Sequence, residues 1–360
     1  MHRTECYDWH VAHDGRMVEF ADWEMPVQYT SIVAEHRVVR MRAGLFDIAH
    51  MGRLRFVGPD AGRFLDAHVT IDVTAIKVGQ VRYALVTNEA GGILDDVLVY
   101  RFDRSFLMVV NASNREKIIS WLSTRVTDFD VTVDDITFEQ FMLAIQGPLA
   151  AEIVQGVVDV ELTRLKYYTA IETSVVGVPA IISRTGYTGE DGFEIILSST
   201  RGLQLWEMLL ECGADQGLQA AGLGCRDTLR LEAGMPLYGH ELDESFDPFT
   251  AGLSFAVKLD AGDFVGRNAL VTAKAKTNRP RRIGLVLEGR RIAREESPIF
   301  AQQNEVGRVT SGTFSPTMEK AIAMAYVDPA QAEPGNKLEV DIRGKRVPAK
   351  VVKLPFYSRS

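Results

Sequence analysis

The chain has 360 residues, with 40 Lys and Arg against 48 Asp and Glu, which gives a formal net charge of −8 at pH 7. At 46% hydrophobic and 24% charged residues, its composition is that of a soluble globular protein rather than a disordered or fibrous one. The length predicts two or three domains. No apolar run reaches the ~18 residues that a membrane span requires, and the acidic balance argues against nucleic acid as the main partner.

The cysteines and the first residues both favour the cytoplasm. Cys6, Cys212 and Cys225 are too widely spaced for a disulfide framework or a zinc site. The first ten residues, MHRTECYDWH, are charged and lack the apolar stretch of a secretory signal. His10 and His13 lie three residues apart, but no third ligand accompanies them, so we expect no metal site.

Helix ends and strand patterns predict the following elements in the first three quarters of the chain. In order, they are a helix capped by Thr30 or Ser31 and ended by Gly44, a helix opened by Gly58-Pro59-Asp60, strands over 81–87, 93–102 and 106–112, a helix capped by Ser113 and Glu116, and helices over 203–210 and 225–233. Strands and helices alternate without strict β-α-β order. This favours an α+β fold over a doubly wound parallel sheet.

From about residue 280 the pattern changes to short strands between turns. We expect strands at 306–313, 322–327, 337–342 and 347–352. The chain is therefore divided into a region of residues 1–279 and a C-terminal β domain of residues 280–360, with the charged segment 278–282 as the linker.

Several common catalytic motifs are missing from the chain. It contains no GxxxxGK[ST] phosphate loop and no GxSxG nucleophile elbow. Gly222-Leu223-Gly224 lacks the third glycine of a dinucleotide fingerprint and the apolar strand before it. We therefore look for the chemistry among isolated carboxylates and arginines.

Two adjacent carboxylates lie inside a strand that is otherwise apolar. Asp96 shares one face with Leu94 and Leu98, and Asp95 lies on the other face, which is also apolar. At least one of them is expected to be desolvated, which raises its pKa and makes it a candidate acid, base or hydrogen-bond acceptor. The alternative is a structural carboxylate held by backbone N–H groups near the turn. Periodicity does not choose between the two aspartates.

The segment 183–195, SRTGYTGEDGFEI, combines a tight turn with a strand carboxylate. Its three glycines let a flat ligand approach the backbone closely. Glu194 lies on the strand face opposite Phe193 and Ile195. A fixed carboxylate near aromatic rings suits a heterocycle with two adjacent N–H donors, such as the amino-oxo edge of a pterin. The alternative is an ordinary hairpin in which Glu194 pairs with Arg184.

The predicted helix over 225–233 carries Arg226 and Arg230 one turn apart on one face. Cations near a helix start oppose the helix dipole, so a negative group is expected nearby. That group is either a substrate carboxylate or Asp227 and Glu232 of the same helix.

Motifs over nearly the whole chain resemble the aminomethyltransferase of the glycine cleavage system, the T-protein family. In order, they are DWEMP at 22–26 with YTSI at 29–32, GLFD at 44–47 leading to HMG at 50–52, the turn and strand at 88–96, the hairpin at 184–194, the segment 225–240, and VTSGTFSP at 309–316.

This resemblance implies a three-lobed fold around a central folate-binding hole. Two interleaved α+β lobes would occupy residues 1–279 and a β-barrel would occupy residues 280–360. It implies an enzyme that moves the one-carbon unit of aminomethyl-dihydrolipoyl H-protein to tetrahydrofolate, which releases ammonia and forms 5,10-methylenetetrahydrofolate. Tetrahydrofolate is then the co-substrate, the partner H-protein carries the lipoyl group, and no metal is implied.

The resemblance also implies roles for individual residues. Asp96 matches the catalytic aspartate of the family, and Glu194 matches the carboxylate that anchors the pterin. The residues that match positions lining the folate hole are Tyr83, Asn111, Tyr187, Arg226, Tyr238 and Met51.

Two other functions remain open at this point. One is a tetrahydrofolate-dependent demethylase of a small methylated amine or sulfonium compound, which would act without H-protein. The other is a non-catalytic folate-binding protein, whose signature KGCYxGQE is replaced here by LEAGMPLYGH. The continuous pattern through His240 favours the T-protein.

Overall fold

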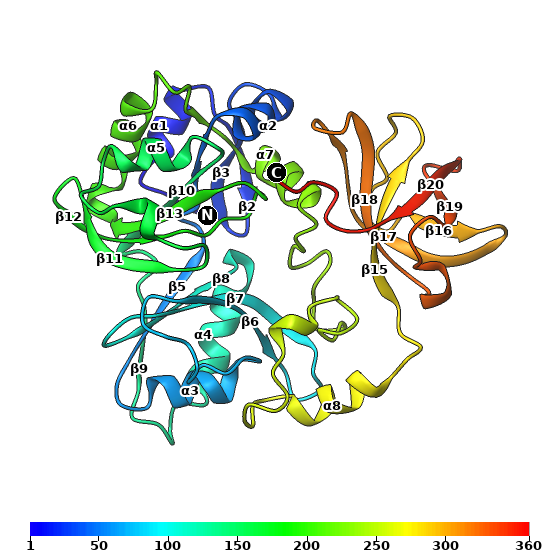
Figure 1. The fold of residues 1–360 in the computed structure, drawn as a ribbon, viewed down its shortest axis with the longest axis horizontal. Coiled ribbons are helices and arrows are strands. Elements are labelled where there is room, and N and C mark those ends of the chain that lie inside the picture. The colour runs from blue at the N-terminus through cyan, green and yellow to red at the C-terminus, as the bar shows by residue number, and fades with distance from the viewer. Residues whose placement is uncertain (360) are drawn as a thin grey trace.

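A computed structural model describes residues 1–359 and consists of two sheet-based lobes and a barrel (Figure 1). The first lobe, the six-stranded lobe, has the strand order β11-β12-β13-β10-β4-β14. Its strands are β4 (Gly44–Asp47), β10 (Gln140–Gln146), β11 (Ala170–Val175), β12 (Val178–Ser183), β13 (Gly192–Ser198) and β14 (Gln219–Ala220). Its helices are α1 (Tyr7–Ala12), α2 (Ile32–Met41), α5 (Ala150–Gln155), α6 (Gly202–Cys212) and α7 (Leu223–Glu232).

A small sheet in the order β1-β3-β2 adjoins this lobe, and a second lobe follows. The small sheet consists of β1 (His2–Arg3), β2 (Arg16–Phe20) and β3 (Trp23–Gln28). The second lobe, the five-stranded lobe, has the order β6-β7-β8-β5-β9. It contains β5 (Gly52–Val57), β6 (Val81–Thr87), β7 (Ile93–Arg101), β8 (Phe106–Val110), β9 (Thr132–Asp135), α3 (Ala61–His68) and α4 (Arg115–Ser123), and α8 (Arg267–Ala275) packs against its β6–β7 turn.

The two lobes are interleaved in the sequence. The chain leaves the six-stranded sheet after β4, builds the whole five-stranded sheet, and returns at β10, which pairs with β4. The segment between β4 and β5 is therefore a direct crossing from one lobe to the other. This agrees with the fold that the sequence resemblance implies.

The third unit is a closed barrel with the strand order β15-β18-β17-β16-β19-β20. Its strands are β15 (Arg281–Leu287), β16 (Pro298–Ala301), β17 (Asn304–Ser315), β18 (Lys320–Val327), β19 (Lys337–Asp341) and β20 (Arg346–Val352). The four expected strands are present, whereas the sequence analysis did not predict β15 and β16. Because β15 begins at Arg281, the last two residues of the expected linker are strand residues.

Capping residues in the sequence correctly predict the start of α2, but not the start of α4 or the end of α2. Ser31 Oγ accepts a hydrogen bond from the Ala34 amide at 3.2 Å and starts α2 as predicted. The expected capping box of α4 does not form, because Asn114 is the N-cap and its side chain bonds a buried carboxylate, while Glu116 pairs with Arg115. α2 ends at Met41, ahead of the predicted stop.

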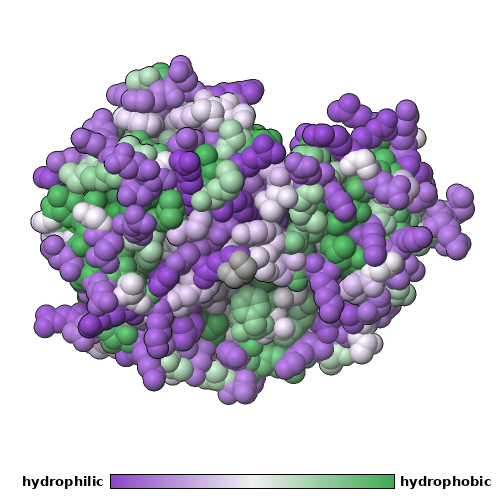
Figure 2. All heavy atoms as spheres, turned by 45° about the horizontal axis from the view of Figure 1, so that its top comes forward, coloured by the Kyte–Doolittle hydropathy of each residue, from purple (hydrophilic) through white to green (hydrophobic). Residues whose placement is uncertain are grey.

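The surface is uneven in character. Hydrophilic residues cover much of the face in Figure 2, with hydrophobic residues between them, and the surface is notched between the lobes and the barrel. No helix within residues 1–359 has the length and apolar character needed to span a bilayer.

Glu232, at the end of α7, joins the six-stranded lobe to the barrel. Its side chain is fully buried. Oε2 accepts hydrogen bonds from Arg40 Nη2 of α2 at 2.9 Å and from the hydroxyl of Thr317 at 2.8 Å. Oε1 accepts a hydrogen bond from Ser315 Oγ of β17. Since a buried carboxylate needs partners, this contact defines where the barrel sits on α7.

We predict that Glu232→Gln lowers the free energy of unfolding by about 2 kcal/mol at pH 7, because the buried Arg40 loses one of its two charge partners and keeps only Glu190, at 2.9 Å. Burial by itself raises the pKa of Glu232, but hydrogen bonds from His36 and Ser315 and the charge of Arg40 outweigh it and bring the pKa to about 2. The ionised carboxylate therefore stabilises the fold fully above the pKa of ~4.3 of an unfolded glutamate. This stabilisation is lost as the pH falls from there towards 2. Denaturant unfolding at a series of pH values measures it.

Glu319→Gln is the matched control, because Glu319 forms an exposed pair with Arg37 of α2 at 3.7 Å and also links α2 to the barrel. It is expected to unfold like the wild type. Equal stability of Glu232→Gln and the wild type at pH 7 would contradict the role of the buried carboxylate.

Candidate active site

The two adjacent aspartates of β7 have different surroundings. Asp95 is fully buried, and its Oδ1 accepts hydrogen bonds from Asn111 Nδ2 at 2.8 Å and Asn114 Nδ2 at 2.6 Å. Its Oδ2 accepts from the backbone N–H of Asn111 at 3.1 Å. Asp95 therefore links the start of α4 to β7. It is a structural carboxylate, which is the alternative that the sequence left open for this strand.

Asp96 is only partly buried and has fewer partners. Its Oδ2 accepts a hydrogen bond from the hydroxyl of Tyr83 at 3.0 Å, and its Oδ1 accepts one from Asn111 Nδ2 at 2.8 Å. Three of the residues predicted for the site, Tyr83, Asn111 and Asp96, therefore lie together on β6, β7 and the end of β8. The remaining lone pairs and exposed surface of Asp96 leave room for a ligand.

Both carboxyl groups are perturbed. Burial raises the pKa of Asp95 and of Asp96, and the charge of Asp96 raises that of Asp95 further. The hydrogen bonds from Tyr83 and Asn111 oppose the shift at Asp96 because they stabilise its charged form. A desolvated carboxylate of this kind responds strongly to a positive charge that develops next to it.

Glu194 is the second desolvated carboxylate and lies on β13 of the other lobe. It is buried, accepts a hydrogen bond from the hydroxyl of Thr185, and has its pKa raised by burial. The alternative pairing with Arg184 does not occur, because that guanidinium bonds Asp191 through Nε at 2.9 Å and Nη2 at 2.5 Å, and the Leu165 carbonyl through Nη1. Glu194 is thus free of the hairpin ion pair, and the charge of Arg226 lowers its pKa against the effect of burial.

The two arginines of α7 have different roles. Arg230 is buried and bonds Glu241 Oε2 at 2.7 Å and Asp227 Oδ1 at 2.8 Å, so its compensating charges are Asp227 and Glu241 rather than Asp227 and Glu232. Arg226 forms no ion pair within residues 1–359, and its guanidinium lies 4.8 Å from the ring centroid of Tyr187. Arg226 is therefore the arginine that is available to a ligand.

The remaining predicted residues surround these groups. The Tyr187 hydroxyl donates to the carbonyl of Pro236. Tyr238 donates to the carbonyl of Ile93, at the start of β7, at 3.1 Å. Met51 is half-buried and packs into the apolar cluster between the two sheets. Tyr187 and Tyr238 are thus anchored by hydrogen bonds rather than held as purely apolar core residues.

Shared electrostatic effects connect the two carboxylates across the lobes. Burial raises the pKa of Tyr168, and the charges of Tyr167, Glu194 and Asp96 raise it further. The pKa of Tyr187 is raised mainly by burial, with the charges of Asp96 and Arg226 acting on it in opposite directions. Asp96 and Glu194 therefore both act on Tyr168, which packs against the apolar cluster between the two sheets.

Sequence reasoning missed several neighbours of this site. Lys117 Nζ donates to the Tyr238 hydroxyl at 2.8 Å, and the exposed ring of Phe255 stacks on Tyr83 with centroids 5.8 Å apart. The C-terminal tail returns from the barrel to the six-stranded lobe, where the Tyr357 amide donates to a carbonyl of α7 and Arg359 pairs with the hairpin (Figure 1). No local pattern could have revealed the tail, because its position depends on how the barrel docks.

The two N-terminal histidines make different kinds of contact. His10 is buried, with Nε2 2.9 Å from Asp47 Oδ2 and Nδ1 2.8 Å from the Tyr29 hydroxyl. His13 stacks on Trp9 with centroids 3.8 Å apart. Within residues 1–359, no group of three or more His, Cys, Asp or Glu side chains is arranged to hold a metal ion.

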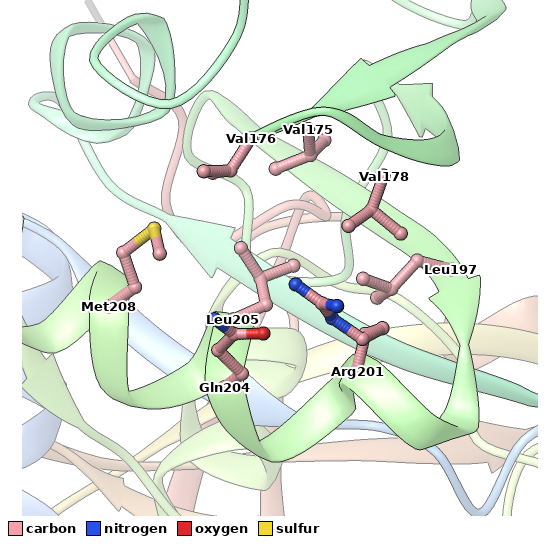
Figure 3. A pocket seen from close by; sticks show the side chains of 8 residues that line it. All are labelled: Val175, Val176, Val178, Leu197, Arg201, Gln204, Leu205 and Met208. Atoms are coloured by element: carbon pink, nitrogen blue, oxygen red, sulfur yellow. The ribbon is translucent and has the colours of Figure 1, made fainter.

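A small apolar cavity lies between the six-stranded sheet and α6 (Figure 3). Its lining comes from the β11–β12 hairpin, the end of β13 and α6, and consists of Val175, Val176, Val178, Leu197, Arg201, Gln204, Leu205 and Met208. Leu197 and Glu194 point to opposite faces of β13. With a volume of about 20 Å³, this cavity accommodates one water molecule and not a heterocycle.

Comparison with known proteins places the whole chain in one family. The model of the GCVT N-terminal domain matches residues 6–261, and that of the glycine cleavage T-protein C-terminal barrel domain matches residues 281–358. A protein of Rubrobacter xylanophilus named aminomethyltransferase is 50% identical over 360 residues, which cover 100% of this chain and 95% of that protein. One of Streptomyces avermitilis with the same name is 47% identical, over 97% of this chain and 96% of its own length.

A solved structure agrees with these matches. The crystal structure of glycine cleavage system aminomethyltransferase T from Bartonella henselae superposes with a TM-score of 0.93 at 34% identity, over 99% of this chain and 98% of that one. The resemblance drawn from the sequence motifs and the three-lobed α+β fold are both confirmed. The chain belongs to the aminomethyltransferase family, the T-proteins of the glycine cleavage system.

Proposed function

We propose that this chain transfers the one-carbon unit of aminomethyl-dihydrolipoyl H-protein to tetrahydrofolate. The products are 5,10-methylenetetrahydrofolate, ammonia and dihydrolipoyl H-protein. The observation that carries the proposal is the placement of two desolvated carboxylates, Asp96 and Glu194, on different lobes of a T-protein fold, each held by uncharged hydrogen-bond donors and neither by a salt bridge. The relatives' shared name, aminomethyltransferase, favours this reaction over demethylation of a small free donor.

The six-stranded lobe and α7 supply the groups that bind the pterin in this proposal. Glu194 accepts the two adjacent N–H donors of the heterocycle, and the hydroxyl of Thr185 holds its carboxylate in place. Arg226 and Tyr187 lie beside it as a stacked cation and ring. Tyr83, Asn111, Tyr238 and Met51 complete the lining from the side of the five-stranded lobe.

Asp96 is the catalytic residue in this proposal. When ammonia leaves the transferred carbon, an iminium-like positive charge develops there. A carboxylate that is already desolvated and held by Tyr83 and Asn111 stabilises this charge and orients the attacking folate amine. Its raised pKa also brings it closer to the range in which a carboxyl group exchanges protons at neutral pH.

Three further points belong to the proposal. The partner is the lipoylated H-protein, which carries the substrate into the site, and no metal takes part. The three free cysteines suit a reducing compartment, and we assign the reaction to the cytoplasm. The domain boundary lies between residues 279 and 280, next to the start of β15 at Arg281.

We predict that Asp96→Asn lowers turnover by about 100-fold or more, the usual effect of losing a group that stabilises charge or moves a proton. Affinity for tetrahydrofolate should stay within a few-fold, because the pterin contacts remain. Ammonia release from loaded H-protein measures turnover, and titration calorimetry measures binding. Asp103→Asn, an exposed aspartate in the turn after β7, is the control and should match the wild type. Unchanged turnover in Asp96→Asn would remove the catalytic assignment.

Glu194→Gln should weaken tetrahydrofolate binding by about 10- to 100-fold, because an amide N–H replaces an acceptor and a charge-assisted hydrogen bond is lost. The substitution keeps the volume of the side chain, so the fold should persist. Glu172→Gln is the matched control, since Glu172 is an exposed glutamate on β11 of the same sheet. Equal affinities of Glu194→Gln and the wild type in a calorimetric titration would show that Glu194 does not hold the pterin.

A further inference from the structure

One buried carboxylate next to the proposed catalytic residue has no part in the proposed reaction so far. Asp95 precedes Asp96 on β7 and is fully buried. Its contact with Asn114 links β7 to the start of α4. Its contacts with Asn111 lead instead to Asp96. The two sets of contacts are made by different partners, so substitutions can separate them.

Asp95 holds Asn111 both by its backbone and by its side chain. Oδ2 of Asp95 accepts a hydrogen bond from the backbone N–H of Asn111 at 3.1 Å, and Oδ1 accepts one from the side-chain amide at 2.8 Å. The pairing of β7 with β8 ends at Leu98 and Val109. Beyond this point, the side chain of Asp95 therefore connects the two segments and fixes the position of Asn111.

The side-chain amide of Asn111 bridges the two aspartates. A primary amide carries two N–H groups on its nitrogen. Nδ2 lies 2.8 Å from Oδ1 of Asp95 and 2.8 Å from Oδ1 of Asp96, with the backbone carbonyl of Asp96 at 3.2 Å. One N–H is thus available to each carboxylate. A flipped amide would turn its carbonyl oxygen towards both carboxylates, which is unfavourable, so Asp95 favours the orientation that donates to Asp96.

This bridge determines how the carboxylate of Asp96 is held. Asn111 donates to its Oδ1, and the hydroxyl of Tyr83 donates to its Oδ2 at 3.0 Å. The two Oδ1 atoms of the aspartates are at most twice 2.8 Å apart, because both contact the same nitrogen. Burial and the charge of Asp96 raise the pKa of Asp95, whereas the N–H groups of Asn111 and Asn114 lower it. The amide therefore stabilises two neighbouring negative groups at once.

We propose that Asp95 is a positioning residue for the transfer reaction. It holds Asn111 at its backbone and at its side chain, and so directs the second N–H of the amide to Asp96 and fixes the orientation of the catalytic carboxylate. This inference rests on the proposed function, because it takes Asp96 as the catalytic residue. Asp95 then has two separate tasks, one towards α4 and one towards the site.

The test separates these two tasks. Asp95→Asn places an amide nitrogen where a carboxylate oxygen accepts a hydrogen bond, and so disturbs the hold on Asn111. Asn114→Ala is the matched control, because it removes only the contact with α4. Asn111→Ala and the double variant Asp95→Asn/Asn111→Ala complete the set. Ammonia release at saturating aminomethyl-loaded H-protein gives kcat and the KM for tetrahydrofolate, and thermal unfolding shows that each variant is folded.

We expect Asp95→Asn to lower kcat by about 10- to 100-fold, the effect of misplacing a reacting group. The KM for tetrahydrofolate should stay within about threefold, because the proposed pterin anchor lies on the other lobe. Asn114→Ala should lower the melting temperature but keep kcat within about twofold of the wild type.

The double variant gives the readout that a merely structural role would not produce. A residue that acts through Asn111 has no further effect once that amide is removed, so the kcat of Asp95→Asn/Asn111→Ala should equal that of Asn111→Ala. If Asp95 supported only the fold, the losses of the two single variants would multiply instead.

Four results would overturn the inference while the proposed function stands. They are an unchanged kcat in Asp95→Asn, an equal loss of kcat in Asn114→Ala, a loss confined to the KM for tetrahydrofolate, and multiplied losses in the double variant. If Asp95→Asn does not fold, Asp95→Ala takes its place, because it introduces no N–H group; failure of both to fold would leave Asp95 a structural carboxylate only. Unchanged turnover in Asp96→Asn would instead overturn the proposed catalytic role, and this inference with it.

Discussion

The buried charges of α7 are the constraint on which the rest of the structure depends. Glu232 is bonded by α2 on one side and by the barrel on the other, and Arg230 is bonded by Glu241 and by Ser311 of β17. Leaving any of these charges buried without a partner would cost several kcal/mol. The six-stranded lobe, α7 and the barrel therefore have one favourable arrangement. That arrangement also fixes the position of Arg226, which lies on the same helix.

The division of the site between two lobes follows from the interleaved topology. Asp96 belongs to a sheet that is inserted whole between β4 and β10, whereas Glu194 lies on a strand that pairs with β10. Each carboxylate is desolvated by its own lobe, and each is held by hydroxyl or amide donors rather than by a salt bridge. Their unneutralised charge is therefore available to a ligand at the junction. In the proposed reaction, this division lets one lobe anchor the pterin through Glu194 while the other presents Asp96 to the transferred carbon.

Local patterns in the sequence predicted much of this arrangement. The alternation of β13 placed Glu194 opposite Phe193 and Ile195, as observed, and the apolar surroundings of Asp95 and Asp96 indicated desolvation. These features depend on residues close in the chain, which is why they could be predicted. The choice of Asp96 over Asp95 required the resemblance to a family, because the two differ in their burial and in their contacts with Tyr83 and Asn114, which come from other parts of the chain.

Features that depend on distant contacts could not be predicted in this way. Arg184 pairs with Asp191 instead of Glu194 because the hairpin turn brings Asp191 across from it. The first two residues of β15 were taken for the linker, since the charges of Arg281 and Arg282 conceal the inward alternation of Ile283 and Leu285.

The central claim is that this chain needs both a lipoyl carrier and a folate acceptor to complete its reaction. The most direct measurement is ammonia release by the purified protein with aminomethyl-loaded H-protein, tetrahydrofolate, or both. Rapid release is expected only when both are present, with 5,10-methylenetetrahydrofolate formed in equal amount. Release at the same rate without tetrahydrofolate, or none with both substrates present, would contradict it.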